Sequence, residues 1–213
     1  MQGAGFLAIW SDVEAAQETD YLHWLTREHT AERLGVDGFM AVRVFKAIDD
    51  RINRFLIIYE LDMPDALSGP SYLARLNAPT PWSQRIMPIL QNFMRGGGRR
   101  RLSAGSGRGG YVAALPLATM LPDAGATAAG LVACDRIAAV HLLETDQAKT
   151  AIQTNEKSLR PKDRSFDGLL LVEGLDQEAI RQAFASCAAV LPAGVTAQAL
   201  PLYTQVFALD RGG

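Results

Sequence analysis

Cysteine is scarce in this sequence, which contains only Cys134 and Cys187 among its 213 residues. Both lie in alanine-rich segments of the second half, where a free thiol packs as a small hydrophobic side chain. A disulfide framework needs more cysteines than this, and two distant cysteines form no cluster of metal ligands. We therefore predict neither a structural disulfide nor a cysteine-based metal site.

An excess of charge of one sign is also missing, since 21 Lys and Arg face 23 Asp and Glu, for a net charge of -2. Such a balance creates no global field that would hold nucleic acid or an anionic membrane. No apolar run approaches the ~20 residues that a membrane-spanning helix needs. The apolar stretch at residues 6–10 follows no basic residue and runs into Asp12 and Glu14, unlike a secretory signal peptide. We expect a cytoplasmic protein with neither a nucleic-acid nor a membrane partner.

The sequence motifs of several common sites are absent. We find no metal-ligand spacing, no strand-turn-helix serine motif and no glycine fingerprint for dinucleotides. The triple arginine at residues 99–101 is flanked by glycines, but it lacks the Lys-Ser/Thr of a phosphate-binding loop. We therefore predict no metal and no cofactor, and we place these arginines at a solvated strand end.

What the sequence does contain is one order of elements repeated twice. Apolar and β-branched runs, capping residues and turn residues predict strand, helix, strand, strand, helix, strand in each half. In the first half these are residues 6–10, 13–34, 39–47, 54–61, a helical region at 64–77 with another helical turn at 79–90, and 91–102. In the second half they are residues 111–117, 123–134, 136–143, 168–173, 177–190 and 199–209. A polar stretch at residues 145–163 receives no element.

This order is typical of the split βαβ pattern of a ferredoxin-like unit. The residues between the halves, 94–110, are rich in glycine and serine and favour a flexible connection. We predict one unit at residues 1–104, which bears the histidine-containing helix, and a second at 105–213 without an active site of its own.

The predicted strands are apolar on both faces, as Phe39 and Phe45 alternate with Met40 and Val44. A sheet with both helices on one face leaves its other face uncovered. Packing the two bare faces together would enclose a lumen in which a ligand can settle. The predicted fold class is α+β, with two tandem ferredoxin-like (βαββαβ) units whose antiparallel sheets pack into an α/β barrel.

The densest group of functional residue types lies on the first predicted helix. At about 100° per residue, Trp24, Glu28 and Glu32 share one broad arc, and His29 lies at its edge. Unpaired carboxylates on a buried face are costly, so this pattern predicts an acid/base assembly. His29 would transfer the proton, and Glu32 or Glu28 would orient it. The competing interpretation is a structural polar network at the end of the helix.

Residues on other predicted elements are candidates for the walls of the lumen. Arg43 and Tyr59 would bind an anionic or phenolic group if their strand faces look inward. Aromatic walls would come from Trp24, Tyr72 and Trp82, and His141 would enter from the second half, opposite His29. For each of these residues, an ordinary place in the core is the competing interpretation.

The run REHTAERLGVDGF at residues 27–39, followed by Arg43, resembles the helix-end histidine motif of EthD-like proteins in the dimeric α/β barrel superfamily. The resemblance covers about the first 95 residues and implies ferredoxin-like units paired sheet to sheet. It also implies a site at His29 first, and less directly at Tyr59 and Arg43. The superfamily includes small cofactor-free lyases, isomerases, polyketide cyclases and oxygenases. The predicted helix at 123–134 contains no His or Glu, so we expect a single site.

Our leading hypothesis is a cofactor-independent acid/base enzyme, a lyase, isomerase or cyclase, acting on a small aromatic or polyketide-like molecule in the barrel lumen. The alternative is a non-catalytic binding or accessory protein for a small hydrophobic metabolite. A third hypothesis, haem- or oxygen-dependent chemistry, rests on fold analogy alone. Exposed edge strands would allow a homodimer.

Overall fold

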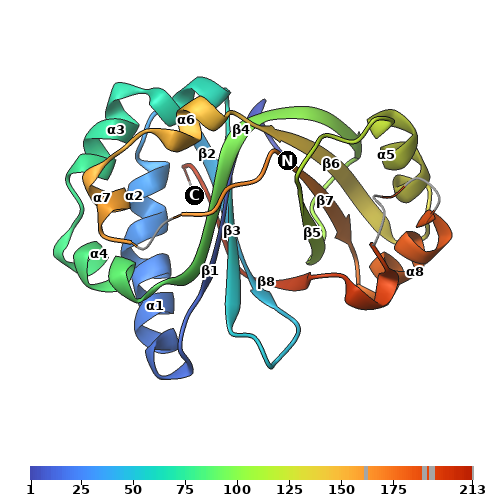
Figure 1. The fold of residues 1–213 in the computed structure, drawn as a ribbon, viewed down its shortest axis with the longest axis horizontal. Helices are drawn as coiled ribbons and strands as arrows, with labels where there is room; N and C mark the ends of the chain where they lie inside the picture. Colours follow the sequence, from blue (N-terminus) through green and yellow to red (C-terminus); the bar gives the residue numbers. More distant parts are fainter. Residues whose placement is uncertain (161–162, 189–190, 192–194, 213) are drawn as a thin grey trace.

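In this computed structural model the chain forms a closed barrel of eight antiparallel strands, with the helices on its outside (Figure 1). The structure describes residues 1–160, 163–188, 191 and 195–212. The strands are β1 (Gly5–Asp12), β2 (Phe39–Ala47), β3 (Arg54–Leu61), β4 (Gln91–Gly105), β5 (Tyr111–Leu117), β6 (Ile137–Thr145), β7 (Gly168–Gly174) and β8 (Leu202–Asp210). The helices are α1 (Glu18–Trp24), α2 (Thr30–Leu34), α3 (Pro70–Asn77), α4 (Pro81–Ile86), α5 (Ala124–Val132), α6 (Gln147–Ala151), α7 (Asn155–Ser158) and α8 (Gln177–Ser186).

Each half of the chain contributes four neighbouring strands to the barrel. Their orders are β4-β1-β3-β2 and β8-β5-β7-β6, and the pairs β2–β8 and β4–β6 join the two sheets. This arrangement confirms the predicted fold class, an α+β barrel of two ferredoxin-like sheets. The residue at which the two units divide stays a prediction. The predicted helix 177–190 ends at residues 189–190, which lie outside the described residues, so that end also stays a prediction.

The glycine-rich segment between the halves belongs to β4, which confirms the predicted strand at residues 91–102, whereas the predicted flexible connection at residues 94–110 is wrong up to residue 105. β4 pairs with β1 along its first part and with β6 along its second. A Cβ atom at Gly96 would lie 2.4 Å from the ring of Phe166, and one at Gly98 would lie 2.1 Å from the carbonyl oxygen of Glu144. These glycines therefore allow neighbouring groups to approach the strand closely.

Three apolar layers form the core. One lies between the first sheet and its helices, and another lies between the second sheet, α5 and α8. The third fills the barrel interior, where Phe6, Trp10 and Phe45 are buried. Bulky side chains pack this interior, and the cavity described below lies outside it, so ligand binding in the lumen stays a prediction.

The polar stretch at residues 145–163 forms α6 and α7, which the local sequence pattern did not predict. The side chains of Asp146 and Thr154 cap these two short helices by accepting hydrogen bonds from backbone N–H groups. The stretch leaves β6 and crosses to the helices of the first half, as Figure 1 shows for α6 and α7 beside α2, α3 and α4. There Asn155 N donates to Asn77 Oδ1 at 3.0 Å and Asn155 Nδ2 donates to the Asn77 carbonyl oxygen at 2.8 Å. A segment of the second half thus becomes part of the first half's helical layer.

Within the described residues, no helix is both long and apolar enough to cross a membrane. Cys134 and Cys187 are free, and their sulfur atoms lie 3.9 Å apart near the ends of α5 and α8.

Candidate active site

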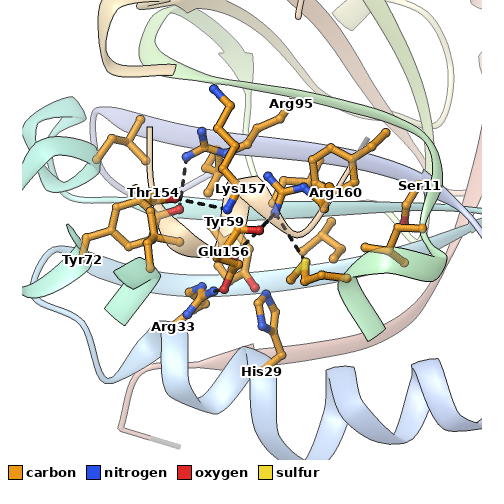
Figure 2. A pocket seen from close by; sticks show the side chains of 18 of the residues that line it. Ser11, His29, Arg33, Tyr59, Tyr72, Arg95, Thr154, Glu156, Lys157 and Arg160 are labelled. Atoms are coloured by element: carbon orange, nitrogen blue, oxygen red, sulfur yellow. Dashed lines mark hydrogen bonds and ion pairs between the residues drawn. The ribbon is translucent and has the colours of Figure 1, made fainter. Parts of the chain in front are cut away.

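A narrow cavity lies between the outer face of the first sheet and the helices that cover it (Figure 2). About 30 Å³ of it is open to water-sized molecules. The first half supplies the wall around Trp24, His29 and Tyr59, and the α6–α7 segment supplies Glu156 and Lys157. We call this space the helix-side cavity. It lies on the face of the sheet opposite to the predicted lumen.

A π-helical turn places His29 on the cavity wall. The predicted helix 13–34 is present, but residues Leu25–His29 form a π turn between α1 and α2. The backbone N–H and the hydroxyl of Thr30 both bond to the carbonyl oxygen of Leu25, the hydroxyl at 2.8 Å. Such turns insert one extra residue into a helix and often occur at functional sites. Figure 2 shows the imidazole of His29 pointing from this helix toward the cavity.

His29 is buried and neutral. Its ring packs against Trp24, with 4.0 Å between the ring centroids, and its Nδ1 has no hydrogen-bond partner in the described part of the chain. Burial, and then the positive charges of Arg33 and Arg160, lower the pKa of His29 well below its usual value of 6.5. At neutral pH the imidazole therefore has a lone pair available to accept a proton or a hydrogen bond.

Tyr59, which also lines this cavity, has a second buried polar atom without a partner. Its side chain is fully buried, and its hydroxyl has no hydrogen-bond partner among the residues that the structure describes. Burial raises the pKa of Tyr59 above the usual value for tyrosine, so the phenol keeps its proton. Leaving a buried polar group unpaired costs about 1–3 kcal/mol. A ligand that bonds to the Tyr59 hydroxyl would recover part of that cost.

A buried ion-pair network forms the cavity wall beside these groups. Glu156 pairs with Arg33 and lies 3.8 Å from Arg160, which also pairs with Asp163 at 2.9 Å. The guanidinium of Arg160 lies 4.1 Å above the ring of Phe93. Because Glu156 bonds to Arg33, it fixes a positive charge near His29.

Four of the predicted site residues come together in this cavity, namely His29, Trp24, Tyr59 and Tyr72. The other predicted residues lie elsewhere. Glu28 accepts a hydrogen bond from Thr80 Oγ1 at 2.6 Å, and Glu32 pairs with Arg75 at 2.9 Å.

Neither Glu28 nor Glu32 lines the helix-side cavity, so the expected contact of one of them with His29 is not seen. Trp82 also lies outside the cavity wall, where its Nε1 donates to Asp20 at 3.1 Å.

Arg43 and His141 point into the barrel interior. Arg43 donates two hydrogen bonds of 2.7 Å to Glu173, and His141 Nε2 lies 3.2 Å from the same carboxylate. The register explains why Arg43 and Tyr59 do not share a site. Arg43 pairs with Ile58, whereas Tyr59 is opposite Val42, and paired residues point to the same face of a sheet. The expectation that Arg43 and Tyr59 line one space is therefore wrong.

Sequence reasoning missed several charged residues of the cavity wall, Arg33, Arg95, Glu156, Lys157 and Arg160. Arg33 follows His29 by about one turn, and this spacing was a usable signal. Nothing in the local sequence pairs residues 156–160 with a helix more than a hundred positions earlier.

Comparison by sequence finds no match to a protein-family profile and none to a curated protein. Solved structures do match over nearly the whole chain. An anthrone oxidase-like protein aligns with a TM-score of 0.55 and 10% identity, covering 100% of this chain and 95% of that chain. A provisionally assigned monooxygenase from Fusobacterium nucleatum aligns with a TM-score of 0.55 and 10% identity, covering 100% and 97%. A provisionally assigned chlorite dismutase aligns with a TM-score of 0.55 and 11% identity, covering 97% and 96%.

The chain shares the α/β barrel fold of these structures. At these identities the likeness shows the fold alone, and the reaction has to be argued from the site. The narrower resemblance to EthD-like proteins stays a prediction.

The residues that the structure describes were tested for a fit to a bound metal or haem. Among the described residues, no group of three or more His, Cys, Asp or Glu side chains could hold a metal ion. Haem iron takes an axial ligand such as histidine. His29 is the histidine of the helix-side cavity, but Trp24 covers its ring and the open space is narrow, so the cavity as packed does not fit a macrocycle.

Proposed function

We propose that this protein is an enzyme that transfers a proton to or from a small aromatic or polyketide-like molecule in the helix-side cavity, as a lyase, isomerase or cyclase and without a cofactor. The observation that carries the proposal is that two buried polar atoms, Nδ1 of His29 and the hydroxyl of Tyr59, lack partners among the described residues and belong to side chains that border one cavity. Buried polar atoms are nearly always hydrogen-bonded, so unpaired ones beside a cavity mark a place for ligand atoms.

The chemistry of the two groups is complementary. His29 is neutral and can act as the general base, and the protonated phenol of Tyr59 can donate a hydrogen bond to an oxygen of the substrate. Removing a proton from a carbon or hydroxyl leaves negative charge on the substrate. Arg33 and Arg160, whose charges lower the pKa of His29, are placed to stabilise that anion. Glu156 is then a positioning residue that holds Arg33.

A ring-sized substrate needs more room than the narrow cavity offers. The wall formed by residues 147–160 contains long side chains, among them Lys157 and Arg160, that can change rotamer when a ligand enters. The cytoplasmic location and the homodimer stay predictions.

Solvent exchange tests the proposed proton transfer even when the product has not been identified. Candidate phenols and β-dicarbonyl compounds are incubated with the protein in D₂O, and loss of the exchanging C–H signal is followed by ¹H NMR. His29→Ala should slow the catalysed exchange by about 10²- to 10⁴-fold, the usual contribution of one general acid or base. Tyr59→Phe should slow it by about tenfold, because one hydrogen bond of about 1.4 kcal/mol is lost.

His23→Ala is the matched control, because His23 lies on the same helix but outside the cavity wall and contacts Arg27. Its exchange rate should equal that of the unmodified protein. Undiminished exchange in a folded His29→Ala variant would contradict the assignment. Ligand binding without any exchange would favour the alternative, a binding protein for a small hydrophobic metabolite.

A further inference from the structure

Arg95 and Lys157 line the helix-side cavity and have no anionic partner among the described residues. In that part of the chain, neither of them lies within 4.0 Å of a carboxylate. Arg95 is 8% exposed, and its guanidinium donates to the Tyr72 hydroxyl and to the Thr150 carbonyl oxygen, both at 3.2 Å. Lys157 Nζ donates to the same carbonyl oxygen at 3.3 Å. Both positive charges are therefore directed at one neutral oxygen.

The neighbouring charges balance one another, so within the described residues the unpaired positive charge comes from Arg95 and Lys157. The cavity is also lined by Arg33 and Arg160, and the carboxylates paired with those two, in the residues that the structure describes, belong to Glu156 and Asp163. Burial lowers the pKa of Lys157, and the charges of Arg95 and Arg160 lower it further, although Asp163 opposes them. In the part of the chain that the structure describes, Arg95 is a buried charge without a carboxylate partner, which is costly, and Lys157 beside it is partly buried, so the site favours a ligand that brings negative charge.

The cations lie away from the proposed base. Figure 2 shows Arg95 and Lys157 on one side of the cavity and His29 on the other. Apolar and aromatic side chains complete the wall, and they include Leu76, Met87, Leu90 and Phe93. The cavity therefore has cations on one side and His29 on the other, and apolar and aromatic side chains form part of its wall.

We propose that the ligand of this cavity is a small aromatic carboxylate, whose carboxylate group is bound by Arg95 and Lys157 with the hydroxyl of Tyr72, and whose ring extends toward His29. Arginine is suited to this task because its planar fork matches the two oxygens of a carboxylate. The inference rests on the proposed function in that it assigns the substrate class of the same cavity.

Binding of benzoate and of its uncharged analogue benzamide tests the charge requirement. Each compound is titrated into the ¹⁵N-labelled protein, and the indole N–H signal of Trp24, a residue of the cavity wall, reports occupancy. Benzoate should bind at least tenfold more tightly than benzamide. Arg95→Gln should weaken benzoate binding tenfold or more and leave benzamide binding unchanged. Arg85→Gln, which removes an exposed arginine outside the cavity wall, should change neither affinity.

Because Arg95 is buried, Lys157→Gln is a second variant that keeps the test decisive if Arg95→Gln does not fold. It should weaken benzoate binding at least threefold. Equal affinities for benzoate and benzamide, or folded Arg95→Gln and Lys157→Gln variants with unchanged benzoate affinity, would overturn the inference. Inorganic phosphate competing as tightly as benzoate would overturn the aromatic part, because the site would then select an oxyanion alone.

The outcome separates this inference from the proposed function. Charge-dependent benzoate binding without His29-dependent proton exchange on any substrate would uphold the carboxylate site and reject the enzyme. His29-dependent exchange without a preference for benzoate over benzamide would uphold the enzyme and reject the carboxylate site.

Discussion

Replacing Glu173 by glutamine should strongly destabilise the protein, because this carboxylate neutralises a fully buried arginine inside the barrel. Arg43 and Glu173 are both 0% exposed and share two hydrogen bonds of 2.7 Å. The backbone N–H of Gly109 donates a third bond to Glu173 at 2.8 Å. Glutamine keeps a similar shape but removes the negative charge, so Arg43 loses its main partner and keeps Glu60 at 3.6 Å.

Two estimates give the expected loss of unfolding free energy in Glu173→Gln. Breaking a buried ion pair by removing one partner costs about 3–5 kcal/mol. Burial alone would raise the pKa of Glu173, but hydrogen bonds from His141 and Arg43 and the charge of Arg43 outweigh it and lower the pKa from 4.5 to about 2. That lowering corresponds to about 3 kcal/mol of stability at neutral pH. We expect Glu173→Gln to lower the free energy of unfolding by about 3 kcal/mol at pH 7.

The stability that the Glu173 carboxylate contributes should decrease as the pH falls. A carboxyl group whose pKa is lowered in the folded protein stabilises it fully above pH 4.5 and loses that contribution as the pH falls from 4.5 toward 2. The difference between the unmodified protein and Glu173→Gln should therefore shrink over this range. Urea unfolding followed by circular dichroism at a series of pH values measures both quantities.

Glu178→Gln, on the exposed face of α8, is the matched control and should change stability by no more than about 0.5 kcal/mol. A loss below about 1 kcal/mol for Glu173→Gln, or a difference that does not vary between pH 5 and 3, would refute the assignment of a strongly coupled pair.

Two further predictions concern β4 and His29. Gly96→Ala should cost about 1–3 kcal/mol in urea unfolding, because the new Cβ meets the Phe166 ring at 2.4 Å, whereas Gly110→Ala, with no atom within 4 Å, should be near neutral. Equal stabilities of the two variants would show that the strand tolerates the side chain. Since the pKa of His29 is lowered by burial, its neutral form is favoured, and folding stability should fall by up to about 1.4 kcal/mol for each pH unit below 6.5. His29→Asn should flatten that slope in urea unfolding at pH 7.5, 6.5 and 5.5, and an unchanged slope would place the titration elsewhere.

Local sequence patterns predicted the strands of the barrel and their order, although they did not predict α6 and α7. The apolar run at residues 111–117 is β5 with its predicted bounds, and residues 39–47 and 54–61 are β2 and β3. Helix periodicity also predicted that His29 and Trp24 lie near a buried face. These features depend on neighbours within one turn or one strand, so a linear sequence records them.

The tertiary structure decided the location and composition of the site. Periodicity indicates which residues are buried but not what they are buried against, so it could not show that Tyr59 faces the helices while Arg43 faces the barrel interior. Local signals were misleading at β4, where glycines typical of a linker serve close packing between segments far apart in sequence. The carboxylate in the cavity wall is Glu156, which pairs with Arg33, rather than Glu28 or Glu32, because pairing of β4 with β6 carries the α6–α7 segment across the first half's helices. The sequence by itself thus determined the strands and the candidate base, whereas long-range strand pairing determined which charged groups surround that base.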